Sequence, residues 1–97
     1  MKIRVQKKTP VVWAVEVKGR HLAPAMYQFD NLYEIKELCE WKFISWEDVT
    51  VDPASGLIRI PGIGAVTLGC YLVESTDKGL EAYDSIEGLQ NFYNIVE

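Results

Sequence analysis

The sequence predicts an α+β domain with a small antiparallel β-sheet of about four to five strands, one central helix and a short C-terminal helix. Three observations support this fold class: period-two alternation of apolar residues in 11–17, a helical apolar stripe in 31–41, and turn residues that separate short β-branched runs beyond residue 50. The length of 97 residues is common for one domain, so we expect a single domain over 1–97.

The most regular strand pattern lies near the start of the chain. One face of this segment carries four apolar side chains, Val11, Trp13, Val15 and Val17. We expect this face to cover the core, with Trp13 as a core residue. The segment 20–29 has no clear period and contains Pro24, so it is predicted to be an apolar loop in which Tyr27 is exposed.

A helix is predicted from Asn31 to about Trp41. Asn31 and Glu34 have the spacing of a capping box, in which each side chain bonds a free N–H group at the start of a helix. One face of the helix carries Leu32, Ile35, Leu38 and Cys39, which we expect to be buried.

Strands and turns are predicted for the second half of the chain. The segment 43–51 is expected to be a strand with a bulge near 47–48, because its apolar positions change from even to odd there. The residues Asp, Pro, Ala, Ser and Gly at 52–56 predict a turn, with return strands over 57–60 and 65–68.

The last elements are a hairpin and a helix. Strands over 70–73 and 80–83 are joined by a loop that contains Gly79, as in a bulged hairpin. A capping signature at 84–87 then predicts a short helix, with one face formed by Ile86, Leu89, Tyr93 and Val96.

The charge is distributed unevenly along the chain. The net charge is −4, but six of the ten Lys and Arg residues lie among the first twenty residues. This basic arm predicts either a guarded edge strand, a surface for oligomerisation, or a contact with phosphate. The residues expected to touch a partner are the charged residues around the arm and one nearby aromatic residue: Lys7, Lys8, Arg20, His21 and Tyr27.

The residue types argue against a metal centre or an enzyme. Cys39 and Cys70 are expected to be free, buried thiols, and with the single His21 they are too few for a zinc site. We therefore predict no metal and no cofactor. Catalysis is not expected either, because no poised histidine or paired carboxylates form a recognisable acid-base motif.

The chain is expected to act in the cytoplasm. No apolar run reaches the roughly 20 residues of a membrane span, and residues 1–8 lack the apolar stretch of a signal peptide.

Two phrases of the sequence resemble a group of small uncharacterised bacteriophage and prophage proteins. In that group the N-terminus runs like KKxPVxVEA, which 7–15 (KKTPVVWAV) resembles, and a C-terminal phrase runs like PGDYIIKGVxGEFYP, which 69–73 and 79–83 (GCYLV, GLEAY) resemble. Cys70 stands where the group has Asp, and Leu80 is inserted before Glu81. The resemblance implies a phage-encoded accessory protein that acts inside a bacterium, and it implies no activity.

These observations lead to three functional hypotheses. The first is a small binding module that docks on a host or phage protein, with inhibition of a bacterial process as one use. The second is a nucleic-acid or nucleotide binder, in which the basic arm contacts phosphate and Tyr27 stacks on a base, although a pI of about 5.0 argues against it. The third is a structural oligomer used in phage assembly.

Overall fold

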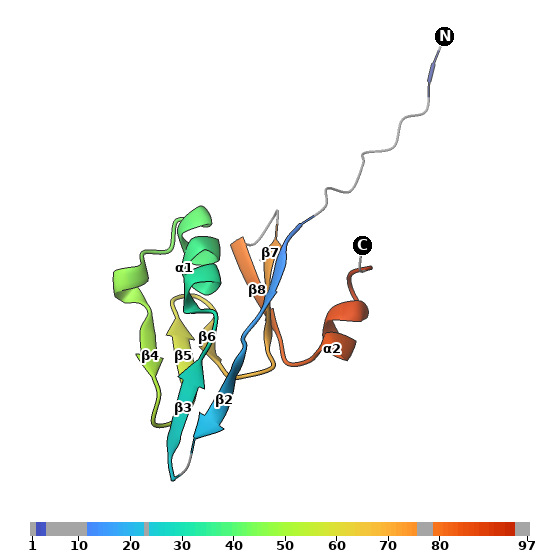
Figure 1. The fold of residues 1–97 in the computed structure, drawn as a ribbon. Coiled ribbons are helices and arrows are strands. Elements are labelled where there is room, and N and C mark those ends of the chain that lie inside the picture. Colours follow the sequence, from blue (N-terminus) through green and yellow to red (C-terminus); the bar gives the residue numbers. More distant parts are fainter. Residues whose placement is uncertain (1, 4–11, 23, 76–78, 95–97) are drawn as a thin grey trace.

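The computed structural model describes residues 2–3, 12–22, 24–75 and 79–94. Within these residues, eight strands form three small antiparallel sheets, and two α-helices and a 3-10 helix lie between and beside them (Figure 1). The predicted α+β class is therefore confirmed. The strands are divided among three sheets that share one core, whereas the sequence suggested a single sheet.

The first sheet joins segments that are far apart in the sequence. Strand β1 (Ala14–Glu16) pairs with β7 (Tyr71–Ser75), and β7 pairs with β8 (Gly79–Tyr83), all antiparallel. Backbone bonds continue the β1–β7 pairing on both sides, because the Val17 N–H donates to the Cys70 carbonyl at 2.8 Å and the Glu74 N–H donates to the Trp13 carbonyl at 2.9 Å. The first strand and both strands of the late hairpin, which were expected from the sequence, thus lie in one antiparallel sheet.

The second sheet is a hairpin of β2 (Gly19–Leu22) and β3 (Met26–Phe29), which projects from the fold in Figure 1. The prediction of a loop over 20–29 was wrong. Most described side chains of this hairpin are exposed, so burial imposes no alternation of apolar and polar residues on its sequence. Pro24 lies in the turn, where it does not interrupt the pairing.

The third sheet contains β4 (Thr50–Asp52), β5 (Leu57–Ile60) and β6 (Gly64–Val66) in that order. The turn between β4 and β5 was predicted correctly. The Asp52 carboxylate accepts hydrogen bonds from the Ser55 hydroxyl at 2.6 Å and from the Ala54 N–H at 3.1 Å. These bonds, the hydroxyl bond first, hold the pKa of Asp52 below its ordinary value.

The predicted strand over 43–51 begins only at Thr50. A single turn of 3-10 helix, η1 (Trp46–Asp48), takes the place of its centre, closed by bonds from the Asp48 N–H to the Ser45 carbonyl and from the Val49 N–H to the Trp46 carbonyl. A helical turn changes the side to which the following residues point, so it explains the change of apolar parity without a bulge.

Helix α1 (Leu32–Trp41) buries the predicted face, with Ile35, Leu38 and Cys39 inaccessible or nearly so and Leu32 partly buried. The predicted capping box was wrong. The Asn31 side chain makes no bond to the helix; its Oδ1 accepts from the Lys18 N–H at 2.9 Å, and its Nδ2 donates to the Glu16 carbonyl. The Asn31 amide, which a capping box would have used, is therefore bonded to backbone groups at the end of β1 and just after it.

The end of α1 is closed by a Schellman motif. The Ile44 N–H donates to the Cys39 carbonyl at 2.9 Å, and the Phe43 N–H donates to the Glu40 carbonyl at 3.0 Å. Phe43 occupies the left-handed position of this motif with φ 61°, where glycine is usual, and its side chain is 99% exposed. This residue therefore carries backbone strain with no compensating burial.

We expect Phe43→Gly to raise the free energy of unfolding by about 1 kcal/mol, because glycine adopts positive φ without strain. Urea denaturation of the wild type and the variant measures the change. Phe43→Ala keeps the strain while it removes the ring, so this control should match the wild type. A loss of stability in both variants would mean that the ring packs on the protein.

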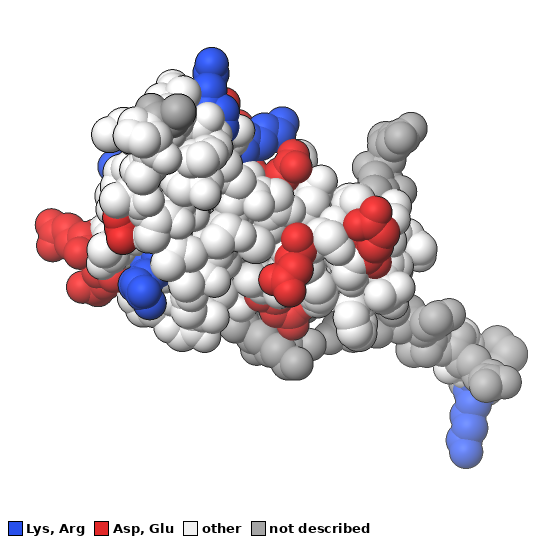
Figure 2. Space-filling model, turned by 90° about the horizontal axis from the view of Figure 1, so that it is seen from below, with Lys and Arg blue, Asp and Glu red and all other residues white. Residues whose placement is uncertain are grey.

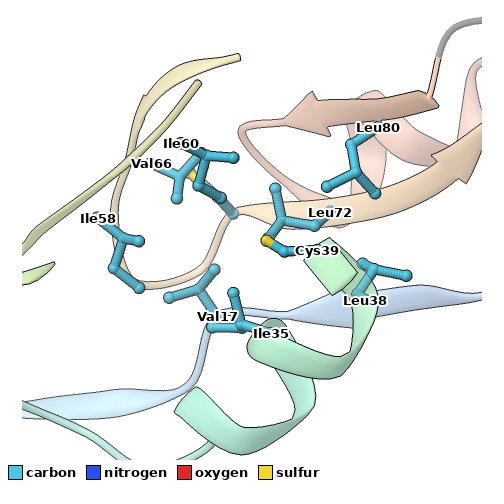
Figure 3. Packing of buried hydrophobic residues seen from close by; sticks show 10 residues of the cluster. Val17, Ile35, Leu38, Cys39, Ile58, Ile60, Val66, Leu72 and Leu80 are labelled. Atoms are coloured by element: carbon cyan, nitrogen blue, oxygen red, sulfur yellow. The ribbon is translucent and has the colours of Figure 1, made fainter. Parts of the chain in front are cut away.

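The main core lies between α1 and the sheets. Val17, Ile35, Ile58, Leu72 and Cys39 are at most 1% exposed, and Figure 3 shows them turned toward one another, with Ile35 and Cys39 on α1 and the others on the sheets or next to them. The two cysteines are free and buried, as predicted. The β1–β7–β8 and β4–β5–β6 sheets would each leave apolar side chains exposed if they stood alone, so this shared core holds them together, and Phe29 of the β2–β3 hairpin packs against it.

Helix α2 (Ile86–Gln90) lies beside β8, and α1 lies on the other side of the β1–β7–β8 sheet in Figure 1. The Ser85 Oγ caps α2 by accepting from the Gly88 N–H at 3.1 Å, and Leu89 is buried. The hydroxyls of Tyr83 and Tyr93 both donate to Glu81, at 2.7 and 3.2 Å. The bond to Glu81 is the main cause that raises the pKa of Tyr83.

Candidate functional site

A groove of about 240 Å³ lies between helix α1 and the β1–β7 pair. We call it the tryptophan groove and define it by its seven lining residues. Two are tryptophans, three are glutamates and two are aliphatic: Trp13, Trp41, Glu34, Glu37, Glu74, Val15 and Leu38. All seven positions belong to described elements or directly adjoin them.

One wall of the groove is a stripe on α1. Glu34, Glu37, Leu38 and Trp41 follow the spacing i, i+3, i+4 and i+7, which places four side chains on one face of a helix. This stripe borders the buried face, and Leu38 belongs to both. The groove therefore begins where the core ends.

The opposite wall comes from the sheet. Trp13 and Val15 lie on the same side of β1, because side chains two residues apart in a strand share a face. Glu74 lies beside Trp13 on β7, since their backbones are joined by the Glu74 N–H bond to the Trp13 carbonyl. The helix and the sheet thus bring together residues 13, 34–41 and 74, which no local sequence motif connects.

The two tryptophans are exposed. Trp13 is 71% and Trp41 is 66% accessible, although tryptophan side chains are mostly covered in folded proteins. The prediction that Trp13 is a core residue was wrong. The apolar face of β1 was identified correctly, since Val17 is buried and Val15 packs on the core, but Trp13 lies at the end of that face, beside the last residue of α1.

The groove is acidic. Glu74 forms an ion pair with Lys42 at 3.6 Å, in which both side chains are largely buried. Glu37 bonds the Tyr33 hydroxyl, and this hydrogen bond is the main reason that the pKa of Tyr33 is raised. No ion pair is formed by Glu34 or Glu37 within the described residues.

The residues that the sequence singled out lie elsewhere. Lys7 and Lys8 are outside the described residues. On the β2–β3 hairpin His21 and Tyr27 come together, with their rings stacked and the centroids 4.5 Å apart. Arg20 pairs with Gln28 and lies on the other face of the hairpin, because successive residues of a strand alternate between faces. None of these three lines the tryptophan groove.

Tyr27 is half-buried, contrary to the expectation that it would be exposed. Its ring lies against Gly56, where a Cβ atom would come within 2.8 Å of it, and its N–H donates to the Pro53 carbonyl at 2.7 Å. The hairpin and the β4–β5 turn are thereby packed together. One face of Tyr27 serves this packing, and the other faces His21.

A second depression, of about 370 Å³, lies along β8 and is lined by Gly62, Ile63, Leu80, Glu81, Ala82 and Tyr83. It is larger, but its polar side chains already bond each other, because the Tyr83 hydroxyl donates to Glu81. The tryptophan groove is the better candidate site, since it presents large aromatic surfaces and carboxylates to solvent.

Charges of both signs lie on the surface of the described part of the chain. On the face drawn in Figure 2, basic and acidic side chains are interspersed around a largely uncharged surface. The described residues contain no group of three or more His, Cys, Asp and Glu side chains arranged to hold a metal ion. Among the described helices, none has the length and apolar character needed to cross a membrane.

One wall of the groove could have been recognised in the sequence, from the residues at helical spacing on α1. Trp41 and Leu38 fall at helical spacing with Glu34 and Glu37, so one stripe of α1 mixes a large aromatic residue with acids. The partner wall could not be identified, because the position of Trp13 relative to this stripe depends on the distant β1–β7 pairing.

No protein-family model, curated protein or solved structure that was compared with this chain matches it.

Proposed function

We propose that this chain is a binding module that takes a partner protein into the tryptophan groove. The observation that carries the proposal is the exposure of Trp13 and Trp41 on opposite walls of one groove. Tryptophan is enriched among the residues that dominate binding energy at protein interfaces, because it buries a large area with few rotatable bonds.

The setting of the proposal comes from the sequence resemblance. A phage or prophage origin would place the chain in the cytoplasm of a bacterial host, where the partner is a host or phage protein whose activity changes on binding. We propose binding without catalysis, since the groove offers indole surfaces and carboxylates as contacts for a ligand.

The experiment compares proteins captured from nuclease-treated lysate of the bacterial host. Wild-type chain and a Trp13→Ala, Trp41→Ala double variant serve as baits, after denaturant melts have shown that both are folded. Phe92→Ala is the matched control, because Phe92 is 73% exposed but lies against Tyr83, outside the groove.

We expect the wild type and the Phe92→Ala control to retain the same proteins and the double variant to lose them. Truncation of central aromatic residues at interfaces typically costs about 2 kcal/mol or more each, roughly a thirtyfold loss of affinity. Equal capture by the double variant would show that the partner binds elsewhere.

Nucleic-acid binding is the second candidate, and the β2–β3 hairpin favours it. This projecting element carries the cation of Arg20 on one face and the stacked rings of His21 and Tyr27 on the other. For this candidate, a gel shift with single-stranded DNA should weaken with salt and with Arg20→Ala. The tryptophan double variant should bind as the wild type does.

A further inference from the structure

We infer that the tryptophan groove binds a cationic side chain, a lysine or an arginine, presented by a basic segment of the partner protein. The inference rests on the proposed function and names the chemistry of the partner. Its starting point is the composition of the groove: three carboxylates line it, and no described Lys, Arg or His does.

The acids are placed to attract a cation. Glu34 and Glu37 lie one helical turn apart on α1, so both carboxylates face the same space. Lys42 pairs with Glu74 at the border of the groove, but it does not line it. The field inside the groove is therefore negative, and a phosphate group would be repelled by it.

The indoles add a second, independent attraction. The face of a tryptophan ring carries the negative part of its quadrupole, so a cation placed over it is stabilised, by about 0.5–1 kcal/mol at exposed sites and more when water is excluded. Trp13 and Trp41 come from different walls, so a side chain that enters between them can meet both rings.

The apolar floor fits the rest of such a side chain. Val15 and Leu38 lie between the tryptophans and the core, where they can cover the methylene stem of a lysine or an arginine. Trp41 is also the last residue of α1, and the carbonyl end of a helix carries a partial negative charge. The apolar floor, the negative charges and the indole rings therefore all favour a lysine or arginine side chain as the ligand.

The test uses four short peptides that differ in one position. Each is acetyl-Ala-Leu-X-Leu-Ala-amide, where X is lysine, arginine, norleucine or glutamate. Titration of the whole chain is followed by the indole N–H resonances in NMR spectra. Trp46 is half-buried and does not line the groove, so its resonance is the internal control.

We expect saturable shifts of the Trp13 and Trp41 resonances with the lysine and arginine peptides, and none for Trp46. The cationic peptides should bind at least about fivefold more tightly than the norleucine peptide, which corresponds to roughly 1 kcal/mol of cation-specific attraction. The glutamate peptide should not bind.

A Glu34→Gln, Glu37→Gln variant should have a smaller preference for the cationic peptides, because only the indoles and Glu74 still attract the cation, while it keeps its affinity for norleucine. Glu87→Gln removes an exposed acid on α2 and should bind as the wild type does. The inference is overturned if norleucine binds as tightly as lysine, if the glutamine variant keeps the preference undiminished, or if no peptide shifts either indole at about 10 mM.

Failure of this inference is distinguishable from failure of the proposed function. Suppose the lysate partner is lost on replacement of both tryptophans but is captured equally by the Glu34→Gln, Glu37→Gln variant. The groove then remains a protein-binding site, and recognition of a cation is excluded.

Discussion

Replacement of Ile35 by alanine is expected to lower the free energy of unfolding by about 3 to 5 kcal/mol. Ile35 is 0% exposed and belongs to the cluster that joins α1 to the sheets, where Figure 3 shows it beside Val17. Large-to-small changes at such positions lose the burial of the removed methyl groups and leave a cavity whose lining loses its contacts. In a domain of this size, such a loss approaches the whole stability.

The measurement is urea denaturation, followed by circular dichroism, with Trp13→Ala as the contrasting variant. Trp13 is the larger residue but is 71% exposed, so its removal should cost less than about 1 kcal/mol. Two losses of similar size would show that the division between the core and the tryptophan groove is wrongly assigned.

Gly19→Ala is expected to destabilise the protein by at least about 3 kcal/mol. A Cβ atom at this position would collide with the carbonyl oxygen of Gln28 on the paired strand and would lie 2.8 Å from Cδ2 of Leu68. The collision is with the backbone, so rotation of a side chain cannot relieve it. The β2–β3 hairpin would have to move away from the core.

Gly88→Ala provides the matched control for this change. Gly88 lies in α2, and an added Cβ would meet only the Ser85 Oγ, at 3.6 Å. The same substitution should therefore raise stability there, by about 0.5–1 kcal/mol, because alanine favours the helix. Thermal unfolding of both variants gives the comparison. A stability of Gly19→Ala within 1 kcal/mol of the wild type would exclude the close approach of the hairpin.

Elements that bury a continuous apolar face could be predicted from the sequence. The stripe of α1 is an example, because its burial requires a period that is visible along the chain. The β7–β8 hairpin was recognised instead from two apolar runs on either side of a loop that contains Gly79. The β2–β3 hairpin could not be predicted in this way, since its exposed side chains are free of that requirement. The single turn η1 was mistaken for a bulge in a strand, because both features shift the apolar residues from even to odd positions in the sequence.

The candidate site was less predictable than the fold. Its residues are individually ordinary, and Trp13 and Trp41 both resembled core residues by type. Their exposure follows from where α1 ends relative to β1, which is a consequence of packing between elements distant in sequence. The basic residues were conspicuous because their charge is concentrated in one part of the chain, but concentration in sequence does not determine what they contact.

The Asn31 side chain has a consequence for how a partner can approach β1. Its amide accepts from the Lys18 N–H and donates to the Glu16 carbonyl, which are the two groups that a neighbouring strand would use at these positions. The Asp30 N–H in addition donates to the Lys18 carbonyl at 2.8 Å. This part of the sheet edge is therefore closed to strand addition. A protein that approached this edge at Glu16 and Lys18 would have to be recognised through its side chains, so its specificity there would depend on sequence more than on backbone shape.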